Sequence, residues 1–127
     1  MNIFKIILIA FFVTIGLVSC KQKAIVLPDP LPTDIISFDT MTMIMTDCYI
    51  AEGGLKQIQL QHENVVQHAN LFYYNIFLKY KVTFDQYKTS LVFYHKYPPI
   101  AEEMYDIAIQ NLSVLESEIK EKEENKN

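Results

Sequence analysis

The residues that most directly suggest metal chemistry are two histidines, the first with a glutamate beside it. His62 and Glu63, followed by His68, invite comparison with the zinc motif HExxH, whose two histidines lie four residues apart on one helix face. Here the histidines are six residues apart, which turns the rings about 120° away from each other on a helix. The spacing offers no third ligand, so we predict no metal site and no cofactor.

Other potential catalytic groups lack the neighbours that a reaction would require. Ser90 does not lie in the Gly-x-Ser-x-Gly sequence that exposes a nucleophile. The chain has only 3 glycines, too few for loops that wrap a phosphate group. We predict no catalytic residue and a non-enzymatic protein, with a hydrolase as the least favoured alternative.

Cys20 is the residue whose surroundings predict a definite modification. It follows a mostly apolar stretch, residues 6–19, which is shorter than the roughly 20 residues that span a bilayer. Residues 17–20 (LVSC) resemble the lipobox, in which a small residue precedes a cysteine that takes diacylglycerol on its thiol. We predict a signal peptide at 1–19, cleavage between Ser19 and Cys20, and a membrane anchor of acyl chains on Cys20. A plain signal peptide with an incidental cysteine is the alternative.

Cys48 is the other cysteine of the chain and lies in a helical pattern among apolar neighbours. With Cys20 carrying lipid, no disulfide within the chain and no cysteine metal cluster is expected. We predict a buried, inert thiol, and an intermolecular disulfide is the alternative.

Composition restricts the class of protein further. The chain of 127 residues has a net charge of −4 and is 50% hydrophobic, with much of the excess in the first nineteen residues. All 11 cations are lysines, so the arginine that reads phosphate and guanine is missing. We therefore expect one domain and no nucleic-acid partner.

The elements that must position these residues are helices. After an extended, proline-rich tether at 20–37, apolar residues recur every three or four positions. Thr83 and Gln86 fit a capping box, and two prolines from Pro98 can start the final helix. The predicted helices cover residues 39–57, 62–80, 84–96 and 98–120. The fold class is all-α, a bundle of about four helices over 38–120, with a charged, disordered tail at 121–127.

Aromatic side chains are concentrated at residues 72–105, where helical spacing places most of them in a core. The neighbours Tyr73 and Tyr74 point about 100° apart on a helix, so one core face cannot hold every ring. A small domain also buries limited surface. We predict that Tyr74, Tyr94 and Tyr97 face a protein partner.

Several motifs in a fixed order resemble a known family. They are residues 44–52 (IMTDCYIAE), 77–83 (FLKYKVT) and 90–94 (SLVFY), after a lipobox and a proline-rich segment. This pattern is similar to a Bacteroidota lipoprotein family of unknown function, the DUF family numbered 4296, over residues 28–115. The chain has Lys81 where that family tends to have Gly, the residue that favours a left-handed helix cap. The resemblance implies an exported helical lipoprotein and supplies no activity or catalytic residues.

The resemblance also bears on location and modification. Residues 21–23 lack both the Asp that resembles an inner-membrane retention signal and the acidic run that resembles a surface-export signal. We expect the outer membrane, with the domain facing the periplasm and surface exposure left open. Thr40, between Asp39 and Met41, resembles an O-glycosylation motif of exported Bacteroidota proteins.

For function, the leading hypothesis is a non-enzymatic interaction or scaffold module for an unknown envelope protein. The alternative is a chaperone-like binder of unfolded envelope clients.

Overall fold

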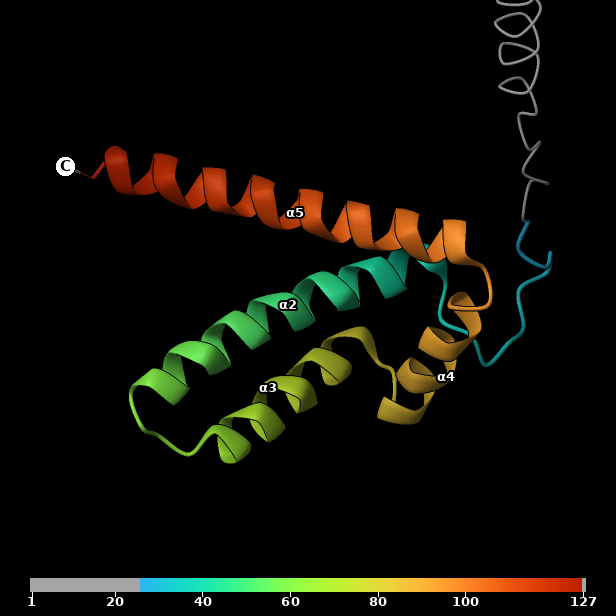
Figure 1. Ribbon diagram of the computed structural model, residues 1–127, viewed down its shortest axis with the longest axis horizontal. Helices are drawn as coiled ribbons and strands as arrows, with labels where there is room; N and C mark the ends of the chain where they lie inside the picture. Colours follow the sequence, from blue (N-terminus) through green and yellow to red (C-terminus); the bar gives the residue numbers. More distant parts are fainter. Residues whose placement is uncertain (1–25, 127) are drawn as a thin grey trace, which may run out of the picture.

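A computed structural model describes residues 26–126 and confirms the predicted all-α class. It contains four helices, which Figure 1 labels. They are α2 (Phe38–Leu60), α3 (Val65–Tyr80), α4 (Phe84–Tyr94) and α5 (Pro98–Glu124). No helix among residues 26–126 has the length and apolar character that crossing a bilayer requires. Ser19 and Cys20 lie outside the described residues.

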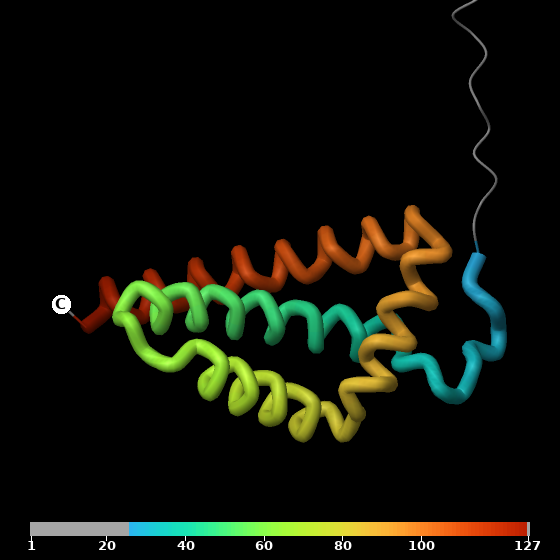
Figure 2. Tube along the Cα trace, turned by 60° about the horizontal axis from the view of Figure 1, so that its bottom comes forward, coloured from blue at the N-terminus to red at the C-terminus, as the bar shows by residue number. Residues whose placement is uncertain are grey.

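α2 lies at the centre of the bundle, with α3 on one side and α5 on the other (Figure 2). α4 crosses the end of this layer where α2 and α5 begin. The stripe predicted for α2 is buried throughout, and its residues are less than a tenth exposed. These residues are Met41, Ile44, Cys48, Ala51 and Leu55. Burial of one apolar face therefore selects the helix and its orientation.

α2 continues three residues beyond the predicted end and passes through Gly53 and Gly54 without a break. The helix propensity of glycine is low, but Leu55 is buried one residue later and holds this turn against the core. A Cβ atom on Gly54 would lie 3.3 Å from the ring of Phe72 on α3. The glycine thus lets the two helices approach closely.

The corner between α3 and α4 forms without the glycine of the related family. Lys81 adopts the left-handed conformation itself, with φ 54° and ψ 39°, and its N–H bonds the carbonyl groups of Leu78 and Phe77. Thr83 and Gln86 then form the predicted capping box at the start of α4. The left-handed backbone of Lys81 is costly for a residue with a Cβ atom.

α5 starts at Pro98, as predicted, but the disordered tail expected at 121–127 is wrong in its first part. The helix runs to Glu124. An ion pair between Lys120 and Glu116, one turn apart at 2.6 Å, supports these turns. The apolar stripe predicts an end near residue 120, but charged residues of opposite sign continue the helix beyond the stripe.

The segment before α2 is attached to α4 rather than free. Ile36 is buried, and its N–H donates to the hydroxyl of Ser90 at 2.9 Å. The hydroxyl of Tyr94 donates to the carbonyl oxygen of Ile36 at 2.8 Å. Both backbone groups of this residue are therefore satisfied by side chains of α4. Leu27 and Ile35 also pack against the core, so much of the predicted tether is part of the domain.

Replacing Tyr94 with Phe is expected to lower the free energy of unfolding by about 1–3 kcal/mol, because the buried carbonyl of Ile36 loses its donor. Urea unfolding followed by circular dichroism measures this. Tyr74→Phe is the matched control, since Tyr74 is 65% exposed. Equal losses in the two variants would contradict this role of Tyr94.

Candidate functional site

A groove between α3 and α4, with a volume of about 690 Å³, is a concave site in the described part of the chain. α3 supplies most of one wall, and the start of α4 supplies the other. Cys48 of α2 lies at its base. The lining residues are Cys48, Asn70, Tyr73, Tyr74, Phe77, Leu78, Val82, Thr83, Phe84 and Tyr87. We call this site the aromatic groove.

The rim of the aromatic groove is apolar and open to solvent. Tyr74, Leu78 and Phe84 are 65%, 61% and 61% exposed. Deeper in the site, the ring of Phe77 lies 5.3 Å from that of Tyr87 and 6.0 Å from that of Phe84. None of the lining side chains carries a charge. Such a surface suits apolar or aromatic groups and gives a phosphate or carboxylate no charged partner.

Polar groups at the base of the aromatic groove are already engaged with one another. The hydroxyl of Tyr73 donates to Glu52 of α2, and the side chain of Tyr87 lies beside the thiol of Cys48. Burial, then the bond to Glu52, raises the pKa of Tyr73, and burial raises that of Tyr87. These hydroxyls stay neutral at physiological pH and serve to hold three helices together.

Cys48 is buried, as predicted, and is a free thiol. Burial raises its pKa from the ordinary 9.0 to about 11, against a smaller opposing effect of the Tyr87 hydroxyl. The thiolate is the nucleophilic form, and the raised pKa keeps this side chain protonated at neutral pH.

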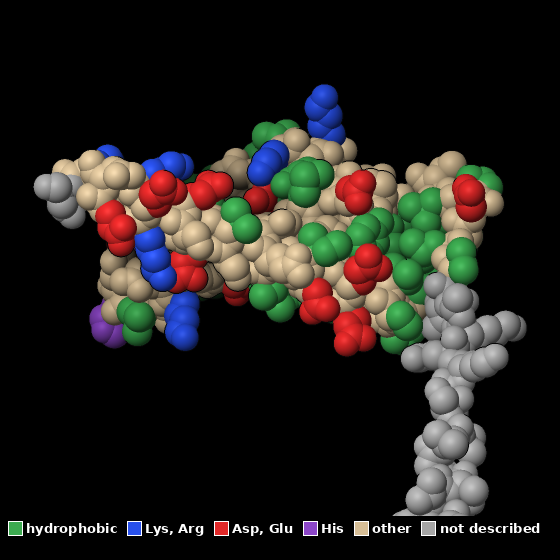
Figure 3. All heavy atoms as spheres, turned by 90° about the horizontal axis from the view of Figure 1, so that it is seen from above, with side chains coloured by type: hydrophobic (Ala, Val, Ile, Leu, Met, Phe, Trp, Pro, Cys, Tyr) green, Lys and Arg blue, Asp and Glu red, His purple; other side chains and the backbone are tan. Residues whose placement is uncertain are grey.

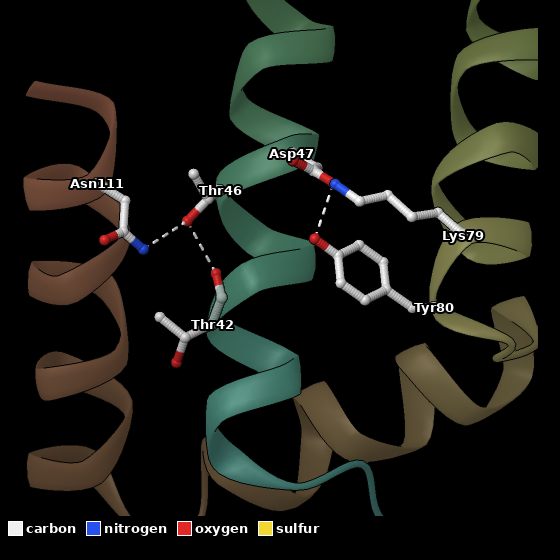
Figure 4. Close-up of polar contacts among 6 residues, drawn as sticks. All are labelled: Thr42, Thr46, Asp47, Lys79, Tyr80 and Asn111. Atoms are coloured by element: carbon white, nitrogen blue, oxygen red, sulfur yellow. Dashed lines mark hydrogen bonds and ion pairs between the residues drawn. The ribbon is translucent and has the colours of Figure 1, made fainter. Parts of the chain in front are cut away.

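Two adjacent residues of α2 tie the flanking helices to it (Figure 4). Asp47 accepts from the ammonium of Lys79 at 2.7 Å and from the hydroxyl of Tyr80 at 2.9 Å, both on α3. Thr46 accepts from the side-chain amide of Asn111 on α5 at 3.3 Å and donates to a backbone carbonyl of α2. These polar residues therefore have a structural role.

The residues considered for catalysis or metal binding do not converge. Within residues 26–126, no group of three His, Cys, Asp or Glu side chains could hold a metal ion. His68 pairs with Glu63 at 3.2 Å, while His62 lies in the turn before α3. Ser90 is fully buried against Ile36 and the carbonyl of Gln86, so it faces no cavity.

The three tyrosines predicted to face a partner have different environments. Tyr74 lies on the rim of the aromatic groove and is largely exposed. Tyr97 is half-buried, with its ring 5.3 Å from that of Phe93. Tyr94 is only 1% exposed, so its assignment to a partner surface is wrong. Its ring packs in the core because its hydroxyl finds the carbonyl of Ile36.

Leu78 and Phe84 are groove residues that the sequence pattern did not predict. The position of Phe84 directly after the cap residue Thr83 could have indicated an exposed side chain. A residue in the first turn of a short helix has few neighbours that cover it. Thr40, the predicted glycosylation site, lies in the first turn of α2 and accepts a hydrogen bond from Ser37 at 2.9 Å.

A family model described as Domain of unknown function (DUF4296) matches residues 32–118. The match includes Ile36, all of α2, α3 and α4, and the entire aromatic groove. The comparison with curated proteins gives no match, and neither does the comparison with solved structures.

The buried thiol predicts a pH dependence of stability. Because the pKa of Cys48 is higher in the folded state, stability is fully present below pH 9.0 and falls as the pH rises through 9.0 toward about 11. Cys48→Ala should remove the first part of this fall, below the ordinary tyrosine pKa of 10.0. Urea unfolding at closely spaced pH values measures both proteins. A parallel decline of the two from pH 9.0 would argue against the raised thiol pKa.

Proposed function

The chain belongs to the DUF4296 family, and from that premise we propose that it is a lipid-anchored envelope protein acting as a non-enzymatic interaction module. Its anchor is the acylated Cys20, in the outer membrane with the domain facing the periplasm. Its binding site is the aromatic groove, which takes an apolar segment of another envelope protein. The observation that carries this proposal is the uncharged groove with three large apolar side chains exposed on its rim.

The energetics of the rim support binding rather than a purely structural role. Tyr74, Leu78 and Phe84 remain largely in water, and burying one such side chain contributes roughly 1.5–3 kcal/mol. Aromatic side chains in pockets are also the typical dominant contributors at protein interfaces. A partner segment that covers these residues would remove their apolar surface from water, and this burial would favour binding.

The small number of polar groups in the groove is relevant to the chaperone alternative. Asn70 and Thr83 are the only polar side chains on its wall apart from tyrosines and Cys48, and the hydroxyl of Thr83 already accepts the capping bond from Gln86. A site with so few fixed polar contacts discriminates weakly between apolar sequences. Crosslinking at the groove can distinguish the two functions, because a scaffold binds one defined partner and a chaperone binds many unfolded ones.

The anchor predicts a change in partitioning. The wild-type protein should enter the detergent phase of a phase-separating detergent and incorporate labelled fatty acid. Cys20→Ser should remain in the aqueous phase without label, because the thiol that forms the thioether is gone. Cys48→Ser is the control and should keep the lipid. Fatty-acid label on the Cys20→Ser protein would contradict the assignment.

The aromatic groove predicts a site-specific complex. With a photo-crosslinking residue at Tyr74, intact cells should yield an adduct, and Leu78→Asn with Phe84→Asn should reduce its amount at least about tenfold through lost apolar burial. Ile109→Asn is the control, since Ile109 is 56% exposed on α5, outside the groove. One adduct of defined mass supports the scaffold, whereas many adducts with unfolded clients support the chaperone. The absence of any groove-dependent adduct would overturn the binding site.

A further inference from the structure

The outward face of α3 presents a continuous row of apolar side chains to solvent. Leu71, Tyr74 and Leu78 follow one another at spacings of three and four residues, so they share one face of the helix. They are 54%, 65% and 61% exposed, whereas Ile76, on roughly the opposite side of α3, is buried. We call these three residues the α3 ridge. Contiguous exposed apolar side chains of this kind are typical of interaction surfaces.

The surroundings of the α3 ridge are almost free of charge. The 16 residues of α3 include no Asp, Glu or Arg, and its one lysine, Lys79, is bonded to Asp47 of α2. Exposed neighbours of the ridge on the same helix include the amides Gln67, Asn70 and Asn75. A helix that faces water usually carries charged residues on its outer side. The composition of α3 therefore resembles that of a helix packed on both faces.

α3 lies at one edge of the molecule, away from most of its negative charge. α2 separates it from α5 (Figure 1). More than half of the 15 acidic residues lie on α5, and the view onto the α5 side shows acidic side chains spread over it (Figure 3). With about 8–10 Å between neighbouring helix axes, two copies that meet along α3 hold their α5 helices about 40 Å or more apart. Salt screens charges over about 10 Å, so two acidic chains can meet at α3 without strong repulsion.

The α3 ridge is self-complementary when two copies of the helix run antiparallel. In a two-fold interface, residue i contacts residue j of the other copy and j contacts i. An axis beside Tyr74 places Leu71 against Leu78 of the second copy, twice, and brings the two Tyr74 side chains together. Apolar residues three and four apart are also the seam by which paired helices interlock. A parallel pair would bring the two Lys81 residues at the ends of α3 together, whereas the antiparallel pair holds them about 20 Å apart.

We propose that the α3 ridge binds the α3 ridge of a second copy of this chain, with the two helices antiparallel. Leu71 of one copy then lies beside Leu78 of the other, on the rim of the aromatic groove. Each copy thus adds an apolar side chain to the binding site of the other. Three apolar side chains from each copy form a small interface, which is typical of reversible association. The inference goes beyond the proposed function and requires neither a lipid on Cys20 nor an envelope partner.

Disulfide formation tests this register, because it requires two Cβ atoms about 3.8 Å apart. Full-length variants are oxidised with copper phenanthroline in detergent-free lysates, which contain the protein whether or not it is anchored. Tyr74→Cys, next to the axis, should give a dimer of twice the monomer mass on a non-reducing gel. Leu71→Cys alone should give at least about fivefold less, since its two copies are about 10 Å apart along the helices. The wild-type protein, with Cys20 and Cys48, sets the background.

A mixed pair of cysteines provides the positive counterpart of this experiment. When Leu71→Cys and Leu78→Cys chains with different epitope tags are produced in the same cells, a disulfide should join the two chains. The same two chains, mixed only after denaturation, are the control and should not be joined. The mixed dimer would support the antiparallel pairing of Leu71 with Leu78.

Matched asparagine variants in the Tyr74→Cys protein separate the α3 ridge from chance collision. Leu71→Asn should lower the amount of dimer at least about tenfold, because each dimer loses two leucines. Val114→Asn is the control, since Val114 is 59% exposed on α5, and it should change the amount less than about twofold. Leu71 does not line the aromatic groove, so its variant tests the dimer and leaves the site proposed for an envelope protein unaltered. Circular dichroism verifies that both variants keep their helices.

Four results would overturn the proposal. Equal amounts of dimer from the two asparagine variants would attribute the disulfide to random collision. As much dimer from Leu71→Cys alone as from Tyr74→Cys would exclude the antiparallel register. A disulfide of Tyr74→Cys with a different protein, without the dimer, would make the occupant that protein. No dimer of Tyr74→Cys above the wild-type background would exclude a second copy.

Discussion

Ile36 sets the position of α4, and the arrangement of the molecule depends on that contact. Its backbone N–H and carbonyl are bonded to Ser90 and Tyr94, more than fifty residues later in the chain. Neither backbone group could be buried without a partner. The segment before α2 therefore acts as a fixed edge against which α4 packs, and the aromatic groove exists because α4 is held across the end of α3.

The helices differ in length, and this difference creates the exposed surfaces. α2 has 23 residues and α5 has 27, but α4 has only 11. α4 can cover no more than about half the length of α2. Near the covered end, Asp47 and Thr46 secure α3 and α5. Beyond it, α2 and α5 separate, and apolar side chains of α5 such as Leu115 and Ile119 remain partly exposed.

Local rules predicted much of the fold. The α2 stripe, the capping box at Thr83 and the start of α5 at Pro98 each depend on neighbours within a few residues, and all three are confirmed. The burial of Tyr94 could not be derived in this way, because its partner Ile36 is distant in sequence. For the same reason, helical spacing identified Tyr74 as exposed but could not show that Leu78 and Phe84 form the rim of one groove with it.

The attachment of the segment before α2 also determines how the domain responds to mechanical load. A pull on the N-terminal side of the chain reaches the domain at Leu27 and Ile36, not at the first turn of α2. The two hydrogen bonds to α4 must break before tension is transmitted to the central helix. A pull of this kind therefore acts first on the contacts between the segment before α2 and α4, the 11-residue helix that forms one wall of the aromatic groove.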